Sequence, residues 1–452
     1  MKIVAVNTYV VTEKLQTPFG MSQWYWEARS SCLVEIVTDE GIIGWGECFG
    51  PAEGSRALID SVFSPLLVGA DPFEHVSLWE SMYNRSREWG RAGVPIAAIS
   101  GIEIALWDTI GKALGQPIHR LLGGRAPNSF DAYASAFYYG GEWAGDIEAE
   151  ARHLAAQGYR HVKMKVGADL RSDIDRVHRV RAALGPDIHL AADANRGYTT
   201  AEALVFARET GTDSLWFFEE PVIPEDLAGY RELRAATAVP IAGGESAFTR
   251  WGFAEMIESR AVDLLQPDAT ACGGLRETLL IAGMASAHGI PTLPHVWGSA
   301  ITVAAGLHLA TALPVVTPSL GRTPSVIELD QAPNSFRQTL SDLDIGPVMS
   351  VPQDRASESR STERSSSRIE PDHPHTASVK ENPCPWTPAP VRTPFPHQPR
   401  PSRTNGCASA DYCSSACSSP TSTARTCRSG SRTSQPTSDF PATNSPARRV
   451  SP

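Results

Sequence analysis

Six short apolar runs between His161 and Trp297 each end at a polar or ionisable residue. They lie in the segments HVKMKVG, LAADANRGY, WFFEEP, IAGGES, LLQPDA and TLPHVWG. Successive end residues are 28, 26, 26, 23 and 27 positions apart, in the order Lys165, Asp193, Glu219, Glu245, Asp268 and His295. A strand, a loop and a helix of about three turns fill such a span. The regular spacing therefore predicts a succession of βα units.

The stretches between these runs carry helical patterns. Apolar residues recur at helical spacing in 172–184 and in 201–210. The runs themselves are continuous rather than alternating, which is typical of parallel strands covered on both faces. In a (β/α)₈ barrel the active site lies at the carboxyl ends of the strands, where these polar residues fall. We therefore predict an α/β fold with a modified (β/α)₈ TIM-type barrel at residues 126–330.

A separate α+β pattern precedes the barrel. Segments 3–11, 31–38 and 42–47 predict antiparallel strands, with a turn at 39–41. Residues 55–122 have a helical pattern that ends at Gly123-Gly124, as helices tend to end. A long loop is predicted at 16–27, and its aromatic residues either cover a site or pack locally. We expect an α+β capping domain at 1–125 and a segment at 331–353 that returns to it.

Composition and charge exclude several classes of function. With 42% hydrophobic residues, most of the 452-residue chain can build a substantial core. A formal net charge of -10 argues against nucleic acid or an anionic membrane as a partner. No leader pattern opens the chain, and no apolar run approaches the length of about 18 residues that a membrane span needs. We expect a soluble, cytoplasmic protein in which Cys32, Cys48 and Cys272 are reduced.

The composition changes abruptly at about Asp354. Residues 354–452 contain no Leu and one Lys, while Ser, Pro, Thr and Arg dominate. Such a segment cannot bury enough apolar area to offset its ordering entropy, so we expect a disordered low-complexity tail. A Cys413-to-Cys417 spacing is loosely zinc-like, but nothing completes a site.

A frameshift explains this tail. With GC-rich codons and one nucleotide added before the Asp354 codon, QDRASESRSTER becomes glutamine followed by GPGLGVEVDRA, a turn and strand that continue the preceding sequence. We therefore hypothesise that residues 354–452 are a frameshifted reading of the C-terminus. An arginine- and serine-rich tail that binds nucleic acid is the competing interpretation, but the basic residues are dispersed rather than clustered.

Three carboxylates, Asp193, Glu219 and Glu245, follow three consecutive predicted strands. Unpaired on one rim, they would repel and raise one another's pKa. A hard divalent cation relieves this repulsion, and three oxygen ligands with open positions suit Mg²⁺. One acidic residue at a strand end more simply caps the following helix, whereas three in register favour a metal site.

Candidate bases flank these carboxylates. Lys163 and Lys165 alternate along one strand, so both point to the same, inward face. Beside a cation in a crowded site the pKa of a lysine falls, which makes Lys165 a candidate general base. On the other side, Asp268 and His295 follow adjacent strands and are expected to pair as a carboxylate-oriented imidazole. A carboxylate substrate held by the cation would lose its α-proton to Lys165 or His295, giving an enediolate.

The ordered motifs K-x-K, D-x-N, E-E-P, G-E-S, Q-P-D and P-H-V-W-G resemble the mandelate racemase subgroup of the enolase superfamily over residues 1 to about 353. The resemblance implies a capping domain whose loops close over the substrate, a modified barrel and a homo-oligomer, often an octamer. It implies that Mg²⁺ is held by Asp193, Glu219 and Glu245. It also implies acid/base catalysis by Lys165 and the His295–Asp268 pair, and substrate contacts by Lys163, Asn195 and Glu328.

Within the subgroup the chain is most similar to acid-sugar enzymes, among them cycloisomerases that open the lactone of a sugar diacid. The resemblance implies removal of the proton α to the carboxylate, followed by elimination of the ring oxygen. A dehydratase shares the same parts and expels a hydroxyl instead, and two opposed bases also permit a racemase or epimerase. A non-catalytic binding protein would be expected to have lost a metal ligand or a base, and none is missing.

Overall fold

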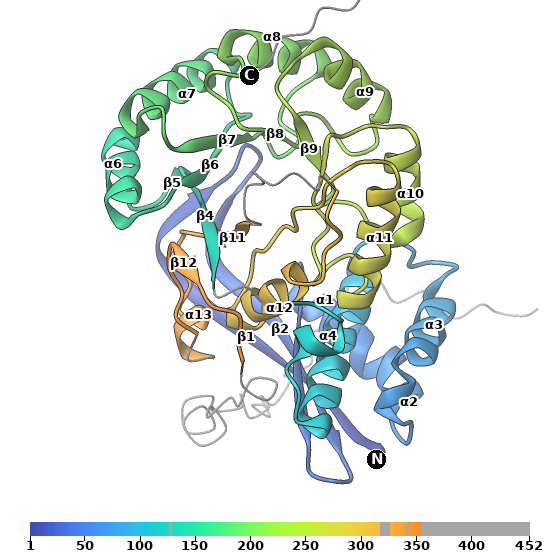
Figure 1. The fold of residues 1–452 in the computed structure, drawn as a ribbon. Coiled ribbons are helices and arrows are strands. Elements are labelled where there is room, and N and C mark those ends of the chain that lie inside the picture. Colours follow the sequence, from blue (N-terminus) through green and yellow to red (C-terminus); the bar gives the residue numbers. More distant parts are fainter. Residues whose placement is uncertain (126–128, 144, 317–325, 341–342, 354–452) are drawn as a thin grey trace, which may run out of the picture. The chain divides into compact units, whose positions relative to one another are not determined.

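The computed structural model describes residues 1–125, 129–143, 145–316, 326–340 and 343–353 (Figure 1). The predictions for residues 354–452 lie outside the described residues. Within them, an antiparallel sheet with its helices is followed along the chain by a parallel sheet with alternating helices. The predicted α/β barrel with an α+β capping domain is therefore confirmed.

The capping domain is built on a four-stranded sheet with the order β3-β2-β1-β5. Its strands are β1 (Ile3–Gly20), β2 (Tyr25–Thr38), β3 (Ile43–Cys48) and β5 (Tyr139–Gly140). The long loop predicted at 16–27 is wrong, because β1 and β2 pair out to Gly20 and Tyr25 across a register shift after Lys14. Aromatic residues favour strands, and β5 pairs with the end of β1. Only residues 21–24 form the tip of this hairpin.

One long helix, α4 (Val94–Leu114), forms the core of the capping domain. Gly44 and Gly46 of β3 let the helix backbone approach the sheet closely, since a Cβ on Gly46 would lie 1.9 Å from the Gly101 carbonyl oxygen. The helix is long and apolar enough to cross a membrane, but 83% of its most apolar window is buried, as in the core helix of a globular domain. The shorter helical elements are α1 (Ala52–Leu58), a π-helical turn (Ile59–Phe63), α2 (Ser64–Leu67), a 3₁₀ turn (Pro72–Glu74), α3 (His75–Ser86) and α5 (Ile118–Leu121).

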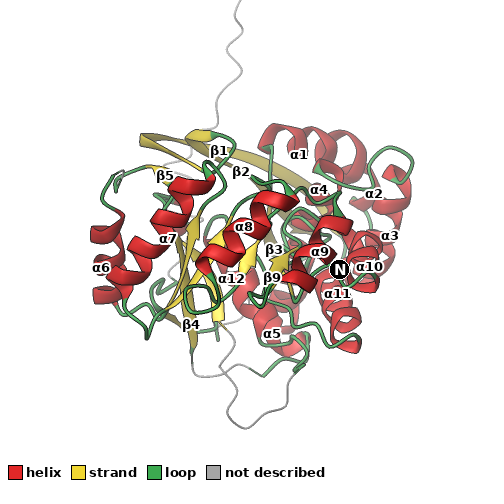
Figure 2. Cartoon of the chain, turned by 90° about the horizontal axis from the view of Figure 1, so that it is seen from above, coloured by secondary structure: helices red, strands yellow, loops and turns green. Residues whose placement is uncertain are grey.

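The parallel sheet of the barrel has the strand order β10-β9-β8-β7-β6-β4-β11 among the described residues. Its strands are β4 (Phe130–Ala136), β6 (His161–Lys165), β7 (His189–Asp193), β8 (Phe218–Glu219), β9 (Ile241–Gly243), β10 (Leu264–Leu265) and β11 (Val326–Asp330). Its helices are α6 (Ile147–Gln157), α7 (Leu170–Leu184), α8 (Thr200–Thr210), α9 (Leu227–Ala236), α10 (Thr249–Glu258), α11 (Leu275–Ala287) and α12 (Ala300–Ala310). Figures 1 and 2 show helices α6 to α11 along the outside of the curled sheet.

One predicted strand is reduced to isolated bridges. The segment before Trp297 pairs with its neighbour only at Leu265–Thr292 and at Asp268–His295. Pro291 and Pro294 carry no N–H donor, which prevents a continuous ladder at this position. The second bridge nevertheless places the two residues of the predicted His–Asp pair side by side.

Apolar side chains fill the barrel beneath the polar strand ends. They form one buried cluster of Tyr133, Ala191, Phe217, Ala242, Leu293 and Val326. A larger apolar cluster includes residues of the strands and of the outer helices. The Lys163 amine lies 5.7 Å from the ring centre of Tyr133, so the inner cluster forms the floor on which the polar residues rest.

The segment after β11 contacts both parts of the molecule. The backbone N–H and the hydroxyl of Ser335 both donate to Glu13 of β1. Arg29 of β2 pairs with Asp330, and its Nε donates to the Pro333 carbonyl at 3.0 Å. After α13 (Phe336–Thr339), however, β12 (Val348–Met349) pairs with β4 of the barrel rather than with the capping sheet. The domain boundaries at 125, 330 and 353 stay predictions.

The close approach of β3 to α4 predicts that Gly46→Ala lowers stability by about 1 to 3 kcal/mol, because the added methyl group meets backbone atoms that cannot move away. A suitable control is Gly252→Ala on α10, where an added Cβ meets no heavy atom within 4 Å. This change should be neutral or stabilising by up to about 1 kcal/mol. Thermal unfolding followed by circular dichroism measures both, and equal unfolding midpoints for the two variants would contradict the packing described here.

Candidate active site

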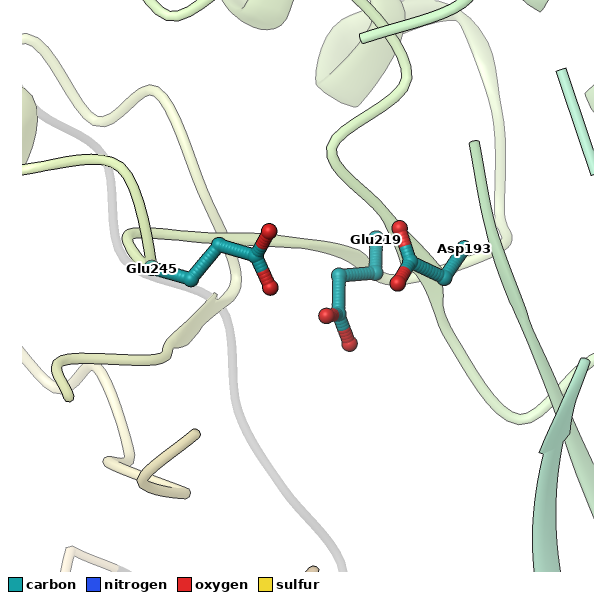
Figure 3. A group of neighbouring side chains, drawn as sticks. All are labelled: Asp193, Glu219 and Glu245. Carbon is teal, nitrogen blue, oxygen red and sulfur yellow. The ribbon is translucent and has the colours of Figure 1, made fainter. Parts of the chain in front are cut away.

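Three carboxylates meet at the carboxyl ends of neighbouring strands. Asp193 ends β7, Glu219 ends β8 directly beside it, and Glu245 follows the end of β9 by two residues. One oxygen of each side chain lies within 4.8 Å of the other two (Figure 3). Asp193 and Glu219 are fully buried, and the Glu245 side chain is 12% exposed. The predicted metal ligands are thus brought together.

Two lysines reach this cluster from β6, on the side of Asp193. The Lys165 amine lies 2.5 Å from Asp193 Oδ2. The Lys163 amine lies 2.7 Å from Glu219 Oε1 and 2.8 Å from Glu328 Oε1 on β11. Both side chains point inward, as the strand period predicts. Lys165 stands at the edge of the carboxylate row, whereas Lys163 lies beneath it on the apolar floor.

A histidine–aspartate pair stands at the other end of the row. His295 Nδ1 lies 2.6 Å from Asp268 Oδ2. The second Asp268 oxygen accepts hydrogen bonds from the backbone N–H of Thr270 at 2.7 Å and from its hydroxyl at 2.5 Å. His295 Nε2 faces Glu245 Oε2 at 3.3 Å. Because Asp268 holds Nδ1, the imidazole presents Nε2 to the cluster, opposite Lys165.

The pKa values of Glu219 and Asp193 shift in opposite directions, because different charged neighbours act on them. Burial raises the pKa of Glu219, and nearby carboxylates add to this effect despite Lys163, so its pKa is about 8. Burial also raises the pKa of Asp193, but Lys165 and Lys163 outweigh it and hold the pKa of Asp193 at about 2. The two lysines therefore keep the pKa of Asp193 low, whereas the pKa of Glu219 stays raised by burial and by the neighbouring carboxylates.

The same crowding acts on the histidine. Burial lowers the pKa of His295, but Glu245, Glu328 and Asp268 outweigh it and raise that pKa to about 10. Around Lys163 and Lys165 the site therefore holds more carboxylates than cationic groups. A divalent cation among the three clustered oxygens would offset this excess, and carboxylate oxygens are the ligands that Mg²⁺ prefers. The residues present fit such an ion.

The sequence predicted a lowered pKa for Lys165, but the side chains around it raise that pKa. Burial lowers the pKa of this amine, but the Asp193 carboxylate at 2.5 Å outweighs burial and raises it above the ordinary value. The expectation assumed a cation that shares the charge of Asp193. Lys165 can act as a base only when its contact with Asp193 is weakened in that way.

Asn195 and Glu328, predicted as substrate contacts, both lie at the cluster. The Asn195 backbone N–H donates to Asp193 Oδ1 at 2.9 Å, and its side-chain amide donates to Glu245 Oε1 at 3.3 Å. Glu328 accepts from the Val296 N–H at 3.1 Å besides pairing with Lys163. In the structure both residues support other residues of the site, and their contact with substrate stays a prediction.

Two residues that orient the site were not predicted from the sequence. Gln266 donates from Nε2 to Glu219 Oε2 at 2.6 Å. Thr270 holds the far oxygen of Asp268 with two hydrogen bonds. Gln266 lies two positions before Asp268 in the Q-P-D motif, so strand periodicity could have placed its side chain at the inner face. Thr270 lies two positions after Asp268, and aspartate side chains commonly accept a hydrogen bond from the backbone two residues on, so a local turn pattern could have found it.

Aromatic side chains from the capping domain lie above the histidine side of the site. The Phe49 ring meets the His295 ring edge-on at 5.9 Å between centroids, and Trp297 contacts both Phe49 and Trp26. At the hairpin tip, Gln23 Nε2 donates to the Asn195 carbonyl at 2.6 Å. The hairpin therefore reaches the barrel rim beside the carboxylates through Gln23, and through Trp26 it contacts Trp297, two residues after His295.

Two family models match the chain. The mandelate racemase / muconate lactonizing enzyme N-terminal domain matches residues 4–123, and the enolase C-terminal domain-like model matches residues 146–326. Together they span both parts of the structure described above.

Curated relatives cover the same region. D-galactarolactone cycloisomerase of Agrobacterium fabrum is 38% identical over 342 residues, which are 75% of this chain and 90% of that protein. Arabinonate dehydratase of Saccharolobus solfataricus is 38% identical over 285 residues, covering 62% of this chain and 76% of the relative.

Solved structures show the same fold. The 3,6-anhydro-D-galactonate cycloisomerase of Zobellia galactanivorans is 35% identical with a TM-score of 0.71, covering 79% of this chain and 95% of that one. A racemase of Streptomyces coelicolor with bound magnesium is 26% identical with a TM-score of 0.70, covering 80% of this chain and 98% of that one.

The carboxylate cluster predicts that Mg²⁺ raises the unfolding temperature, since a ligand at about 100 times its Kd stabilises by roughly 2.7 kcal/mol. Glu245→Gln should weaken this effect strongly. Glu245 is the ligand best suited to substitution, because Lys163 and Lys165 pair with Glu219 and Asp193 instead. Its replacement therefore leaves no buried lysine without its carboxylate partner. The exposed Glu255→Gln on α10 carries the same charge change and should behave like the wild type. An equal response of both variants would exclude Glu245 as a ligand.

Proposed function

We propose that this chain, which belongs to the mandelate racemase / muconate lactonizing enzyme family and is an enzyme of the isomerase or lyase type, removes the proton α to the carboxylate of an acid sugar or its lactone, in a reaction like that of a galactarolactone cycloisomerase. The observation that carries this proposal is the placement of two bases, Lys165 and His295, at opposite ends of one carboxylate row.

Each group of residues in the site has its own role in the proposed reaction. Bound by Asp193, Glu219 and Glu245, Mg²⁺ would hold the substrate carboxylate and offset the charge of the enediolate. In its unprotonated form, Lys165 Nζ or His295 Nε2 takes the α-proton, according to the face that it meets. For both residues this form requires that the charge of the carboxylates that raise their pKa is balanced. Asp268 keeps the proton on His295 Nδ1, so that Nε2 is the reacting atom. Lys163 supplies positive charge from the floor of the site.

In a cycloisomerase reaction no atom is lost. The α-proton leaves, the bond between the neighbouring carbon and the ring oxygen breaks, and the ring oxygen departs as a carboxylate. The resulting enol gains a proton on carbon and loses the proton of its hydroxyl, which gives a 2-keto-3-deoxy acid. The residue that did not remove the first proton stands on the other side of the substrate, where it can deliver one. Similarity to two cycloisomerases supports this proposal.

Two related reactions remain as second candidates. Similarity to arabinonate dehydratase favours loss of a hydroxyl as water from an open-chain sugar acid. The two-base geometry also allows a racemase or epimerase, in which the proton is removed on one face and returned on the other, and similarity to a racemase of Streptomyces coelicolor favours this candidate. All three reactions begin with the same step and differ in the leaving group.

A substrate screen separates these reactions. We expect the chain with Mg²⁺ in D₂O to convert galactarolactone, but not open-chain galactarate, into a deuterated 2-keto-3-deoxy acid, followed by proton NMR. Product from an open-chain sugar acid alone would identify a dehydratase. Exchange of the α-proton with inversion and without product would identify an epimerase. Neither product nor exchange from any acid sugar, with Mg²⁺ bound, would contradict the proposed substrate class.

Removing either base tests the mechanism. We expect Lys165→Met and His295→Asn each to lower kcat by about 10²- to 10⁴-fold, the usual contribution of a general acid or base. Substrate and Mg²⁺ binding should persist, because neither residue is a proposed metal ligand. Stopped assays over long times measure the residual rates. A variant that retains full activity would show that its residue is not one of the two bases.

A further inference from the structure

Two buried glutamates of the capping domain reach into the barrel at the loops that carry the histidine–aspartate pair. We infer that Glu47 and Glu103 are positioning residues, which set the geometry of His295 and Asp268 through those loops. The inference deepens the proposed function and rests on it only for its catalytic consequence. The structural consequence can be measured without a substrate.

Glu47 on β3 holds the start of α12, four residues after His295. Its carboxylate accepts hydrogen bonds from the backbone N–H of Ser299 at 3.1 Å and from the hydroxyls of Ser299 at 2.5 Å and Thr302 at 2.6 Å. Ser31 of β2 donates a further hydrogen bond at 2.6 Å. Glu47 is only 2% exposed, so water cannot replace these contacts. The chain from His295 to Ser299 is therefore fixed at its far end by the capping domain.

Glu103 on α4 holds the start of α11 in the same way, seven residues after Asp268. It accepts from the Leu275 N–H at 2.7 Å and the Arg276 N–H at 3.1 Å. Trp107 on the same helix orients it with a hydrogen bond of 2.7 Å from Nε1. A negative charge at a helix N-terminus is favoured, and here it comes from the other domain.

Other capping residues hold the loop after Asp268 along its length. The Phe49 N–H donates to the Thr270 carbonyl at 3.1 Å. Trp79 Nε1 donates to the Gly273 carbonyl at 2.8 Å, and the Gly273 N–H donates to Ser100 Oγ at 2.8 Å. Because Thr270 itself orients Asp268, the contacts lead from the capping domain to the carboxylate that orients His295.

The loop after Lys165 is held differently. Asp173 on α7 accepts from the Gly167 N–H at 2.9 Å and the Asp169 N–H at 3.0 Å, and from the hydroxyls of Tyr139 and Tyr198. The carboxylate of this anchor lies in a barrel helix, and of the four donors named only Tyr139, on β5, belongs to the capping sheet. The two bases are thus secured by different parts of the chain, and a change in Glu47 or Glu103 should affect His295 but not Lys165.

The first experiment observes the hydrogen bond between His295 and Asp268 directly. In protein labelled with ¹⁵N-histidine, the proton shared over 2.6 Å should give a downfield NMR signal that His295→Asn removes. We expect Glu47→Gln and Glu103→Gln to shift or broaden this signal, because an amide cannot accept all the N–H and O–H donors that meet the carboxylate. Asp173→Asn, which also removes a buried carboxylate, should leave it unchanged.

The second experiment measures exchange of the α-proton separately on each face of the substrate. Two substrates that differ only in configuration at the α-carbon present the α-proton to opposite faces. One of these epimers should no longer exchange its α-proton in His295→Asn, and the other should no longer exchange it in Lys165→Met. We expect Glu47→Gln to slow exchange of the His295 epimer by about 10- to 100-fold, since small misplacements of a catalytic group cost this much. Exchange of the Lys165 epimer should change far less, and Asp173→Asn should show the reverse pattern.

The outcomes distinguish a failure of the positioning role from a failure of the proposed function. An unchanged His295 signal in both folded glutamine variants, or equal loss on both faces, would overturn the positioning role. If the wild type exchanges no acid sugar at all, the proposed function fails while the NMR result still decides the positioning role. Should Glu47→Gln fail to fold, Thr302→Val removes one donor to Glu47 with little change of shape. It should shift the same signal by a smaller amount.

Discussion

The mutual repulsion of carboxylates gathered in a dry site is the constraint on which this structure depends. Asp193, Glu219 and Glu245 share one end of the barrel, with Asp268 and Glu328 close by. Two buried lysines offset part of this charge, and they in turn are stable there only because the carboxylates surround them. Neither set would persist without the other. A divalent cation would offset the remaining excess of negative charge, which raises the pKa of His295 to about 10.

This arrangement explains why the site is built on strand ends and closed by a second domain. Short parallel strands place one ionisable residue each on a common rim, above a floor of apolar side chains such as Tyr133 and Phe217. The capping domain excludes water with aromatic residues and supplies Glu47 and Glu103 to the loops that carry the histidine–aspartate pair. Exclusion of water strengthens every charge interaction inside, so the capping domain contributes to the electrostatics of the site.

Much of this was predictable from sequence, because the strand period and the spacing of βα units act locally. These two patterns predicted Lys165, Asp193 and Glu219 at strand ends, and each of these residues is the last residue of its strand in the structure. The hairpin of β1 and β2 was longer than predicted, since pairing with β5, a strand more than 100 residues away, extends it. The role of Glu47 depends on contacts between distant segments, which no local pattern records. The raised pKa of Lys165 likewise follows from a distance to Asp193 that only the structure gives.

The central claim is that a divalent cation balances the clustered carboxylates. Anomalous diffraction from crystals grown with Mn²⁺ in place of Mg²⁺ tests it most directly, because the signal locates the metal without any assumption about the reaction. We predict one strong peak bonded to oxygens of Asp193, Glu219 and Glu245. A peak elsewhere, or none at saturating Mn²⁺, would mean that the lysines and protonation alone balance the charge, and the mechanism derived from this site would no longer hold.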